Sequence, residues 1–515
     1  MKPKRFYFRS TALFSVPLRC GAPVFIGFAV FISGLTADGA IYGSSSNSKG
    51  TKSAPGATPA GGNPPAAANL ARANAKDLRA RTNLAVGAAL AMQKAAQKAA
   101  TQNGLNHLGK NPNRPDVNLP DVPNGLGIGG LQIAPGVGTD PTKWTGAELP
   151  TSSTYLSKTK GTQGNITKTK VTIRQTSQQA LLNWQTFNVG KNTVVKFDQS
   201  KGGADVSKWV AFNKISDPTG DPTQILGSIK AQGQVYLING NGIIFGGSSQ
   251  VNARGLTVSS LPINDNLIKS GLLNNPDSQF LFSGLAIPAK KTPAFTPEAP
   301  LAINGDKYGD VIIQKGASLK SPTNASKIGG RVTLVGPNVL NEGSISTPDG
   351  QTILAAGLQV GFTSHSRAND TLANKFDDSS LRGLDVFIGV VESAEAGLYA
   401  GRAEHTGLIQ SARGNITIAG REVNQLGILD SSTSVALNGR IDLLAHYNTA
   451  IGNDPSSGGF FRVENSGIVT IGKGSLTRIL PETKSKETTN GTELALRSQI
   501  NVAGKAIHFS AECTS

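Results

Sequence analysis

Short runs in which apolar and polar residues alternate cover most of the chain after about residue 152. Residues 165–175 and 192–199 both follow this pattern, with Ile, Val and Phe separated by polar residues. An alternation with a period near two is typical of strands that bury one face. In residues 233–256 the apolar runs are divided by clusters of Asn, Gly and Ser, which form turns readily. The pattern predicts an all-β region of short strands and tight turns.

Two segments of this region, 341–357 and 405–420, resemble each other. The matched pairs are Gly343 with Gly407, Ile345 with Ile409, and Gly350 with Gly414. Gly427 begins the pattern again about twenty residues after Gly407, and Ser466-Gly467-Ile468-Val469 opens in the same way. Such a period is typical of the stacked coils of a parallel β-helix, with Ile, Val and Leu pointing inward. A Greek-key sandwich also has short strands, but its hairpins would not repeat one motif at this spacing.

The first part of the chain has the order of a secretory signal peptide. Basic residues come first, an apolar run follows at residues 24–35, and small residues occupy positions 37–40. The apolar run is too short for a typical membrane span. We expect residues 1–40 to be removed on export, with a retained signal anchor as the alternative.

Residues 41–144 have the composition of a linker. Ser, Gly, Ala and Pro dominate its start, and such a segment buries too little apolar surface to offset its ordering entropy. Residues 66–102 are rich in Ala and lack proline, which predicts a helix that acts as a solvated spacer or as a partner-binding segment. The G-x-G-x-x-G at residues 125–130 lacks the strand and helix of a dinucleotide site, so we interpret it as a Gly-rich loop.

Composition agrees with short strands and adds a strong positive charge. The 515 residues include 61 Gly but only 3 Trp, and 50 Lys and Arg against 33 Asp and Glu give a net charge of +17. This charge favours anionic surfaces such as lipopolysaccharide or acidic polysaccharide, and it also serves solubility. Basic runs with interleaved aromatic residues are absent, so we expect no nucleic-acid partner. Loss of Cys20 with the signal leaves Cys513 as the single cysteine, so no intrachain disulfide is expected.

The sequence offers little for catalysis. Enzymes with a β-helix fold need clustered carboxylates or a calcium site, and the close acidic pairs, Asp377-Asp378 and Glu392 with Glu395, fall between repeats. The five histidines have no metal-ligand spacing, and no G-x-S-x-G occurs. We therefore expect no catalytic residue, no metal and no cofactor, and keep a polysaccharide-active β-helix enzyme as a rival hypothesis.

Residues 177–199 and 221–260 resemble the haemagglutination-activity, or two-partner secretion, domain of filamentous haemagglutinin-like exoproteins. The first block carries Ala180, Trp184, Phe187, Asn188 and Gly190, and the second carries residues 224–227 and 239–246. The resemblance implies a right-handed parallel β-helix with an N-terminal cap, exported through the periplasm by a dedicated outer-membrane pore protein. It places this domain at residues 145–265, further coils with irregular insertions at 266–480, and a tail or truncated coil at 481–515.

The resemblance also nominates residues for partner recognition. Asn239, Asn241, Gly242 and Ile243 match the family's Asn-Pro-Asn-Gly-Ile turn, with Gly240 in place of the proline. This turn either recognises the pore partner or forms a purely structural corner. The residues that the resemblance makes structural are Trp184, Phe187, Asn188, Gly190, Leu226 and Gly227.

The function implied is that of a secreted or cell-surface bacterial adhesin. Its expected partners are the outer-membrane pore and the surface of a host or neighbouring cell, including anionic glycans. A contact-dependent toxin-delivery protein that lacks its toxin end is the alternative from the same family. The two share the N-terminal domain, so the β region alone does not separate them.

Overall fold

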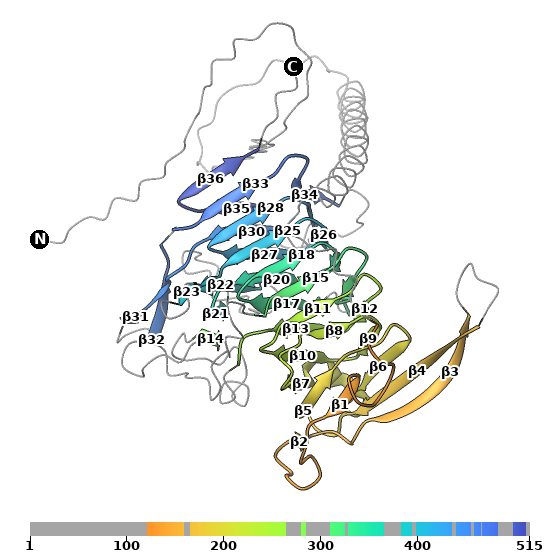
Figure 1. Ribbon diagram of the computed structural model, residues 1–515. Helices are drawn as coiled ribbons and strands as arrows, with labels where there is room; N and C mark the ends of the chain where they lie inside the picture. The colour runs from red at the N-terminus through yellow and green to blue at the C-terminus, as the bar shows by residue number, and fades with distance from the viewer. Residues whose placement is uncertain are drawn as a thin grey trace, which may run out of the picture. The chain divides into compact units, whose positions relative to one another are not determined.

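The described part of the chain is built almost entirely from short strands. The computed structural model describes residues 121–158, 165–263, 280–284, 309–324, 328–364, 383–393, 398–434, 439–454, 458–464, 466–482 and 498–510 (Figure 1). The expected signal peptide and Ala-rich helix lie outside these residues. The one helix within them is a 3-10 helix, η1 (Ser200–Lys208), so the described residues contain no helix long and apolar enough to span a bilayer.

Three sheets of stacked strands form the body. The first sheet contains β5 (Gln179–Phe187), β7 (Val210–Ile215), β10 (Gln234–Asn239), β13 (Gly255–Ser259), β17 (Arg331–Gly336), β20 (Gln351–Ala356), β27 (Asn415–Gly420), β30 (Arg440–Ala445) and β35 (Gln499–Ala503). The second contains β8 (Thr223–Ile225), β11 (Ile243–Phe245), β15 (Val311–Ile313), β18 (Val339–Asn341), β25 (Arg402–His405), β28 (Glu422–Gln425), β33 (Ile468–Ile471) and β36 (Ala506–Phe509). The third contains β4 (Asn165–Arg174), β6 (Thr193–Asp198), β9 (Ser228–Ala231), β12 (Gln250–Asn252), β16 (Ser318–Lys320), β19 (Ser344–Ser346), β26 (Leu408–Ser411), β29 (Ile428–Thr433) and β34 (Leu476–Pro481).

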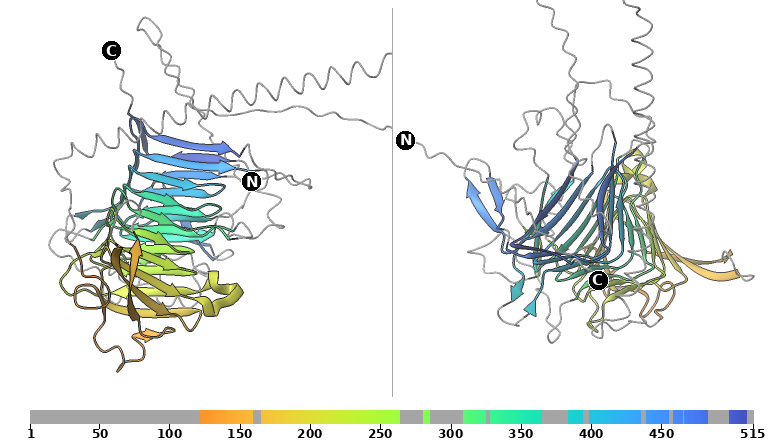
Figure 2. Two further views of the ribbon diagram at one scale, coloured as in Figure 1. Left: turned by 90° about the vertical axis from the view of Figure 1, so that its right-hand side faces the viewer. Right: turned by 90° about the horizontal axis from the view of Figure 1, so that it is seen from above.

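The chain visits these sheets in a fixed order, so that each coil places its strands beside those of the coil before it. From β10 onward the order is first, second, third, and then back to the first. All pairs between coils are parallel (Figure 2). Parallel strands need a connection that returns to the starting edge, and here the rest of each coil supplies it. The expected all-β parallel β-helix is therefore confirmed.

The register shows how the sequence segments stack. Ile345 lies beside Ile409, and Ile409 beside Leu429, all in the third sheet. Ile468 instead pairs with Glu422 in the second sheet. Our alignment of Ser466-Gly467-Ile468-Val469 with the third-sheet segments was therefore wrong, because a Gly-Ile step also occurs at the corner that enters the second sheet.

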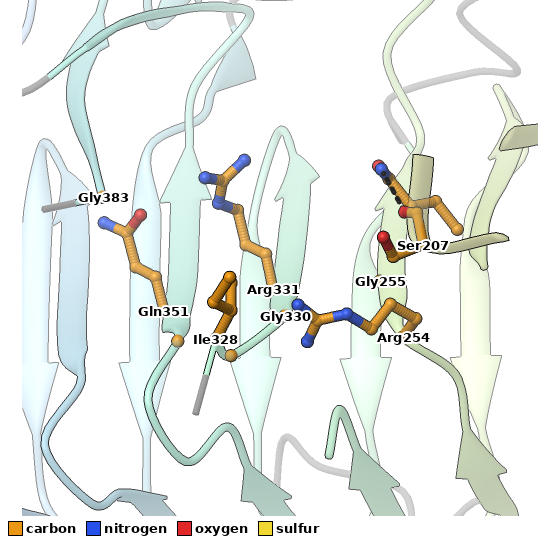
Figure 3. A pocket seen from close by; sticks show the side chains of 11 residues that line it. Ser207, Arg254, Gly255, Ile328, Gly330, Arg331, Gln351 and Gly383 are labelled. Atoms are coloured by element: carbon orange, nitrogen blue, oxygen red, sulfur yellow. Dashed lines mark hydrogen bonds between the residues drawn. The ribbon is translucent and has the colours of Figure 1, made fainter. Parts of the chain in front are cut away.

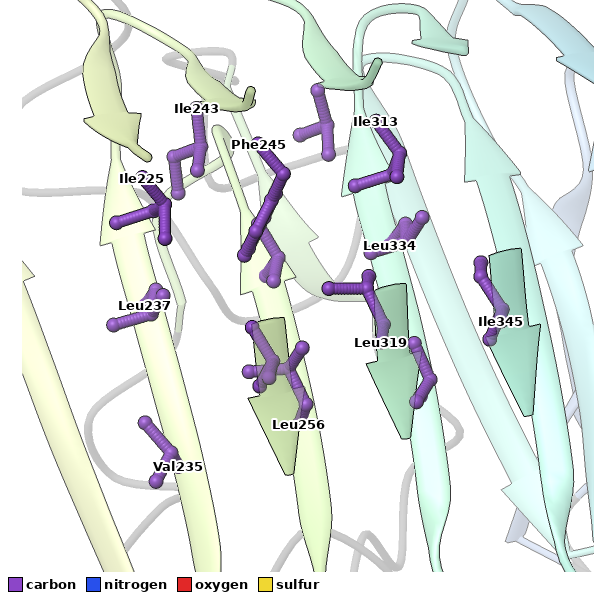
Figure 4. Packing of buried hydrophobic residues seen from close by; sticks show 14 of the residues in the cluster. Ile225, Val235, Leu237, Ile243, Phe245, Leu256, Ile313, Leu319, Leu334 and Ile345 are labelled. Carbon is purple, nitrogen blue, oxygen red and sulfur yellow. The ribbon is translucent and has the colours of Figure 1, made fainter. Parts of the chain in front are cut away.

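Side chains that point inward from the three sheets form one continuous inner core. Val235, Leu237, Ile243, Phe245 and Leu256 are fully enclosed there, in rows that run from coil to coil (Figure 4). Inward positions alternate with outward ones along each strand because successive side chains point to opposite faces. Burial of such a side chain contributes about 1.5–3 kcal/mol, so the core stabilises every coil together with its neighbours.

An antiparallel cap covers the first coil. β1 (Leu131–Ile133) and β2 (Trp144–Thr145) pair antiparallel with β5, and β3 (Thr151–Lys158) pairs antiparallel with β4 at the edge of the third sheet. These strands supply backbone partners to coil edges that would otherwise be open. Residues 121–144 thus belong to the folded cap, and the expected linker does not extend through them. The Gly-rich composition of residues 125–130 suggested a linker, but these glycines form tight turns against the first coil.

An outer sheet covers part of the first sheet from outside. β14 (Phe280–Ser283), β21 (Gln359–Ser364) and β22 (Leu384–Ile388) form it, within the stretch that we expected to hold irregular insertions. Its apolar side chains pack against outward-facing residues of the first sheet in a second cluster, here called the outer cluster. Two short antiparallel pairs stand beside it: β23 (Glu392–Ser393) with β24 (Leu398–Tyr399), and β31 (Ala450–Asp454) with β32 (Gly458–Arg462).

Candidate partner-recognition site

The nominated turn lies at the corner where the chain leaves β10 for β11. The Asn239 side-chain Oδ1 accepts a 3.0 Å hydrogen bond from the Asn241 backbone N–H, and the Asn239 carbonyl accepts another of 3.0 Å from the Gly242 N–H. Asn239 itself is buried, with its Nδ2 donating to Thr223 Oγ1 at 2.9 Å in the preceding coil. The first asparagine therefore holds the turn together from inside.

The second asparagine also anchors the turn to the preceding coil. Asn241 Nδ2 donates a 2.9 Å hydrogen bond to the carbonyl oxygen of Asp217, which lies in the loop between β7 and β8. Asn241 and Gly240 are the half-exposed residues of the turn, whereas Gly242 and Ile243 are buried. A partner can therefore contact Asn241 and Gly240 directly, while the other residues shape the turn.

Gly242 is required by the backbone. Its φ is +101°, a conformation that disfavours residues with a Cβ. A Cβ at this position would also lie 2.9 Å from the carbonyl oxygen of Asp310 in the next coil. Ile243 then enters β11, where it pairs with Thr223 on one side and Val311 on the other. Close stacking of three coils thus explains the Gly-Ile step of the motif.

A buried carboxyl group lies under this corner. Burial raises the pKa of Asp310 to about 6, although a hydrogen bond from Asn338 Nδ2 at 3.0 Å opposes the shift. The Asp310 backbone carbonyl accepts a hydrogen bond from the Ile243 N–H. Desolvation disfavours the ionised carboxylate, and the amide donor stabilises it only in part.

The aromatic residues of the first motif block fill the first coil under the cap. Trp184 and Phe187 are fully buried, with ring centroids 5.1 Å apart in an edge-on arrangement. Trp144 from β2 packs on Trp184 at the same centroid distance. The Trp184 Nε1 donates a 3.0 Å hydrogen bond to Asn213 Oδ1, which satisfies both polar groups inside the core.

Asn188 joins the cap to the coils. Its Nδ2 donates to the carbonyl of Gly129 at 3.0 Å, and its Oδ1 accepts from the Gln224 backbone N–H at 2.8 Å. Gly190 lies under the cap, since a Cβ there would be 2.5 Å from Asn124 Oδ1. The sequence alone does not reveal Gly129 or Asn124, because the segment before β1 that contains them has the composition of a linker.

Leu226 and Gly227 form the corner between β8 and β9. Leu226 is buried, and both backbone N–H groups donate to the carbonyl of Val189, at 2.8 and 3.0 Å respectively. The two motif blocks therefore meet on successive coils, with Asn188 and Asn239 both bonded to residues of β8. Neighbours such as Asp217 and Asp310 take part through backbone atoms, which leave no motif in the sequence.

Other polar residues are stacked inside the coils. Asn341, His405 and Gln425 occupy equivalent positions in successive strands of the second sheet. Asn341 Nδ2 and His405 Nδ1 are 3.1 Å apart, and His405 Nε2 is 3.0 Å from the carbonyl of Ile428. Burial lowers the pKa of His405 to about 4, so the ring is neutral and donates through Nε2. This row joins the corners of successive coils through side-chain hydrogen bonds.

Among the residues that the structure describes, no group of three or more His, Cys, Asp and Glu side chains could hold a metal ion. Glu392 is exposed in β23, whereas Glu395 and Asp377-Asp378 lie outside the described residues.

Comparison with known proteins agrees with the position of the two motif blocks. The family described as "TPS secretion domain" matches residues 152–418. A heme/hemopexin-binding protein of Haemophilus influenzae is 25% identical over 291 residues, which are 56% of this chain and 28% of that protein. A second Haemophilus influenzae protein of the same name is 36% identical over 94 residues, 18% of this chain and 9% of its own length. This chain thus spans under a third of these relatives.

A crystal structure of the HMW1 secretion domain from Haemophilus influenzae is also similar to this chain. The sequence identity is 18% and the TM-score 0.35, with 70% of this chain and 87% of the other covered. The fold assignment above rests on the strand pairing within this chain.

Proposed function

The chain belongs to the TPS secretion domain family of two-partner secretion exoproteins, and on that premise we propose that its capped coils direct export through a cognate outer-membrane pore protein. The observation that carries the proposal is the family match over residues 152–418, which includes the first coils and both motif blocks. We transfer the export role alone, because the matched part is 28% of the relative's length.

We place the partner contact at the half-exposed part of the turn, Gly240 and Asn241. The turn is rigid because Asn239, Gly242 and the preceding coil fix its backbone. A preorganised surface loses little conformational freedom on binding, which favours recognition. The rival interpretation is a structural corner, and it is supported by the internal hydrogen bond of the Asn241 amide to Asp217.

Secretion of Asn241→Ala distinguishes the two interpretations. The substitution removes one hydrogen bond and should cost about 1 kcal/mol of stability. The control is Asn338→Ala, at the equivalent corner between β17 and β18, where the side chain donates to Asp310 and accepts from the Arg402 backbone N–H, so that the control loses at least as many hydrogen bonds as Asn241→Ala. Both proteins should fold, but Asn241→Ala should remain in the periplasm when it is coexpressed with its pore, while Asn338→Ala is secreted.

Two results would contradict these proposals at different levels. Normal secretion of Asn241→Ala would mean that the turn is a structural corner and that the pore protein contacts another surface. Secretion of the unmodified chain without any outer-membrane pore protein overturns the export role itself.

We also propose that the exported protein attaches to cell surfaces and carries out no catalysis. The support is the net charge, which is +13 once residues 1–40 are removed and which attracts anionic surfaces over distances of about 10 Å at 0.1 M salt. Binding of the purified protein to cells should fall steeply with ionic strength. Binding that is insensitive to salt would contradict this electrostatic attachment.

A further inference from the structure

A small pocket opens on the outer side of the first sheet, away from the nominated turn. It has a volume of about 170 Å³ and is lined by residues of several coils (Figure 3). Its charged lining residues are Arg254 and Arg331, and its lining includes no Asp or Glu. Ser207, Gln234 and Gln351 add polar groups. The pocket therefore carries a net positive charge.

Arg331 is the first residue of β17, and its side chain lies among enclosed groups. Its Nε atom is buried and has no hydrogen-bond partner. Arg331 interacts electrostatically with Tyr236, but burial raises the pKa of that phenol, so it is neutral at pH 7. Burial also lowers the pKa of Arg331, but from a value so high that the guanidinium stays charged. A partly buried charge that faces no carboxylate is costly, so the site is suited to an anion.

Arg254 stands one coil earlier, directly before β13. Its Nη1 donates a 3.1 Å hydrogen bond to the carbonyl of Pro322, and its backbone carbonyl accepts one from Ser321 Oγ. The first bond fixes the Arg254 side chain and the second fixes its backbone, but neither supplies a carboxylate to the guanidinium. Figure 3 shows Arg254, Arg331 and Gln351 extending around the pocket from neighbouring coils.

The other partly or fully buried arginines in the described ranges behave differently, because each contacts a carboxylate. The pairs are Arg413 with Asp349 and Glu482, Arg421 with Glu422, Arg440 with Asp385 and Asp442, and Arg478 with Asp430. Within the described part of the chain, Arg254 and Arg331 contact no carboxylate, and they lie close together because Gly255, which follows Arg254, pairs with Arg331. In their common pocket an external anionic group could complete the pattern.

We propose that this pocket binds a single small oxyanion, a carboxylate, sulfate or phosphate group, between Arg254 and Arg331. Guanidinium groups match planar or tetrahedral oxyanions with paired N–H donors. The volume is below the range of about 300–1,000 Å³ that is typical for drug-sized ligands, so one anionic group of a larger molecule fits better than a whole cofactor. Acidic polysaccharides supply carboxylates and sulfates, and lipopolysaccharide supplies phosphates.

Calorimetric titration of the full chain with sodium glucuronate, sulfate and phosphate, at constant ionic strength, tests the proposal. At least one of these anions should bind the unmodified protein, and Arg331→Met should weaken that binding at least about tenfold. Arg331→Lys should retain part of the affinity, since it keeps the charge but loses the fork of donors. The control is Arg462→Met, which removes an exposed arginine and should leave the titration unchanged.

Thermal unfolding gives a second readout that does not depend on affinity alone. Without added anion, Arg331→Met should unfold at a higher temperature than the unmodified protein, because it removes a partly buried charge that has no carboxylate partner. The preferred anion should raise the unfolding temperature of the unmodified protein and leave that of Arg331→Met unchanged. The proposal fails if no anion binds, or if Arg331→Met binds as tightly as Arg462→Met. Preference for glucuronate or sulfate indicates a polysaccharide source, and preference for phosphate a lipopolysaccharide source.

Discussion

The inner core and the outer cluster are both apolar and enclosed, but they join very different parts of the chain. In the inner core each side chain meets the equivalent side chain of the next coil, as Ile345 meets Ile409. In the outer cluster Phe282 of β14 packs on Phe362 of β21, with ring centroids 5.9 Å apart, although two coils separate them in sequence. The inner core is therefore repetitive and local, whereas the outer cluster depends on one particular set of insertions.

This difference explains why both faces of the first sheet are apolar. Phe212, Tyr236 and Ile353 point outward from the first sheet into the outer cluster, while Val235 and Leu237 point into the inner core. A strand that is buried on both faces has a nearly continuous apolar run instead of an alternation. The outer cluster thus turns one wall of the β-helix into the middle layer of a three-layer structure.

Truncation of a large side chain in the inner core should have the largest effect on stability. Trp184→Ala leaves a cavity and removes the donor to Asn213, so we expect a loss of about 3–5 kcal/mol in the free energy of unfolding. Because the first coil supports those above it, the loss should appear in cooperative unfolding of the whole β-helix. Denaturant unfolding followed by circular dichroism measures it. Unchanged stability would show that the cap does not rely on this tryptophan.

The corresponding change in the outer cluster should be smaller and more local. Phe282→Ala should cost about 3 kcal/mol, because three strands on the surface can relax around the lost ring more easily than a closed core. Hydrogen exchange should increase in β14, β21 and β22 while the coils stay protected. Phe509→Ala is the control, since this side chain is 69% exposed and should change stability by under about 0.5 kcal/mol. Equal loosening of coils and outer sheet would remove the distinction between the two regions.

The two regions also contain one buried histidine each, which makes their stability sensitive to acid. His405 lies in the inner row of the second sheet, and the His446 Nε2 accepts a 3.3 Å hydrogen bond from the Ile388 N–H of β22. Burial lowers the pKa of both rings to about 4, below the 6.5 of an unfolded histidine. The unfolded chain therefore binds more protons between pH 6.5 and 4, and the native state loses stability as the pH falls through this window.

Substitution by glutamine should flatten this pH dependence in the region concerned. His405→Gln copies the residue of the next coil, Gln425, and should remove about 1–3 kcal/mol of the acid-induced loss in global unfolding. His446→Gln should reduce the loss in the outer sheet, as measured by hydrogen exchange at pH 5 and 7. His508→Gln, at an exposed position, is the control. A pH profile that neither buried substitution alters would contradict burial as the cause.

Alternation and the Gly-x-Ile repeats were sufficient to predict the parallel β-helix, because each inner residue repeats in the next coil. The outer sheet was not predicted, because its strands come from separate insertions that share no repeated motif. An alternation of apolar and polar residues indicates only one buried face of a strand. The continuous apolar runs at residues 235–238 and 353–356 were the available signal. The turn residues were found through the resemblance, but the carbonyl of Asp217 and the position of Asp310 depend on coil stacking, which a motif does not encode.

The outer sheet also has a consequence for the order in which the molecule folds. Neighbouring coils can pair as soon as a short further segment of chain is available, which favours growth from the capped end upward. Phe280 of β14 pairs with Gly361, and Val360 with Ile388 of β22, so the outer sheet cannot close until residues up to 388 are free to fold. Until then the aromatic side chains of Phe212 and Tyr236 face water. We expect a transient, aggregation-prone intermediate at this stage. Its lifetime determines how long the folding chain needs protection from aggregation.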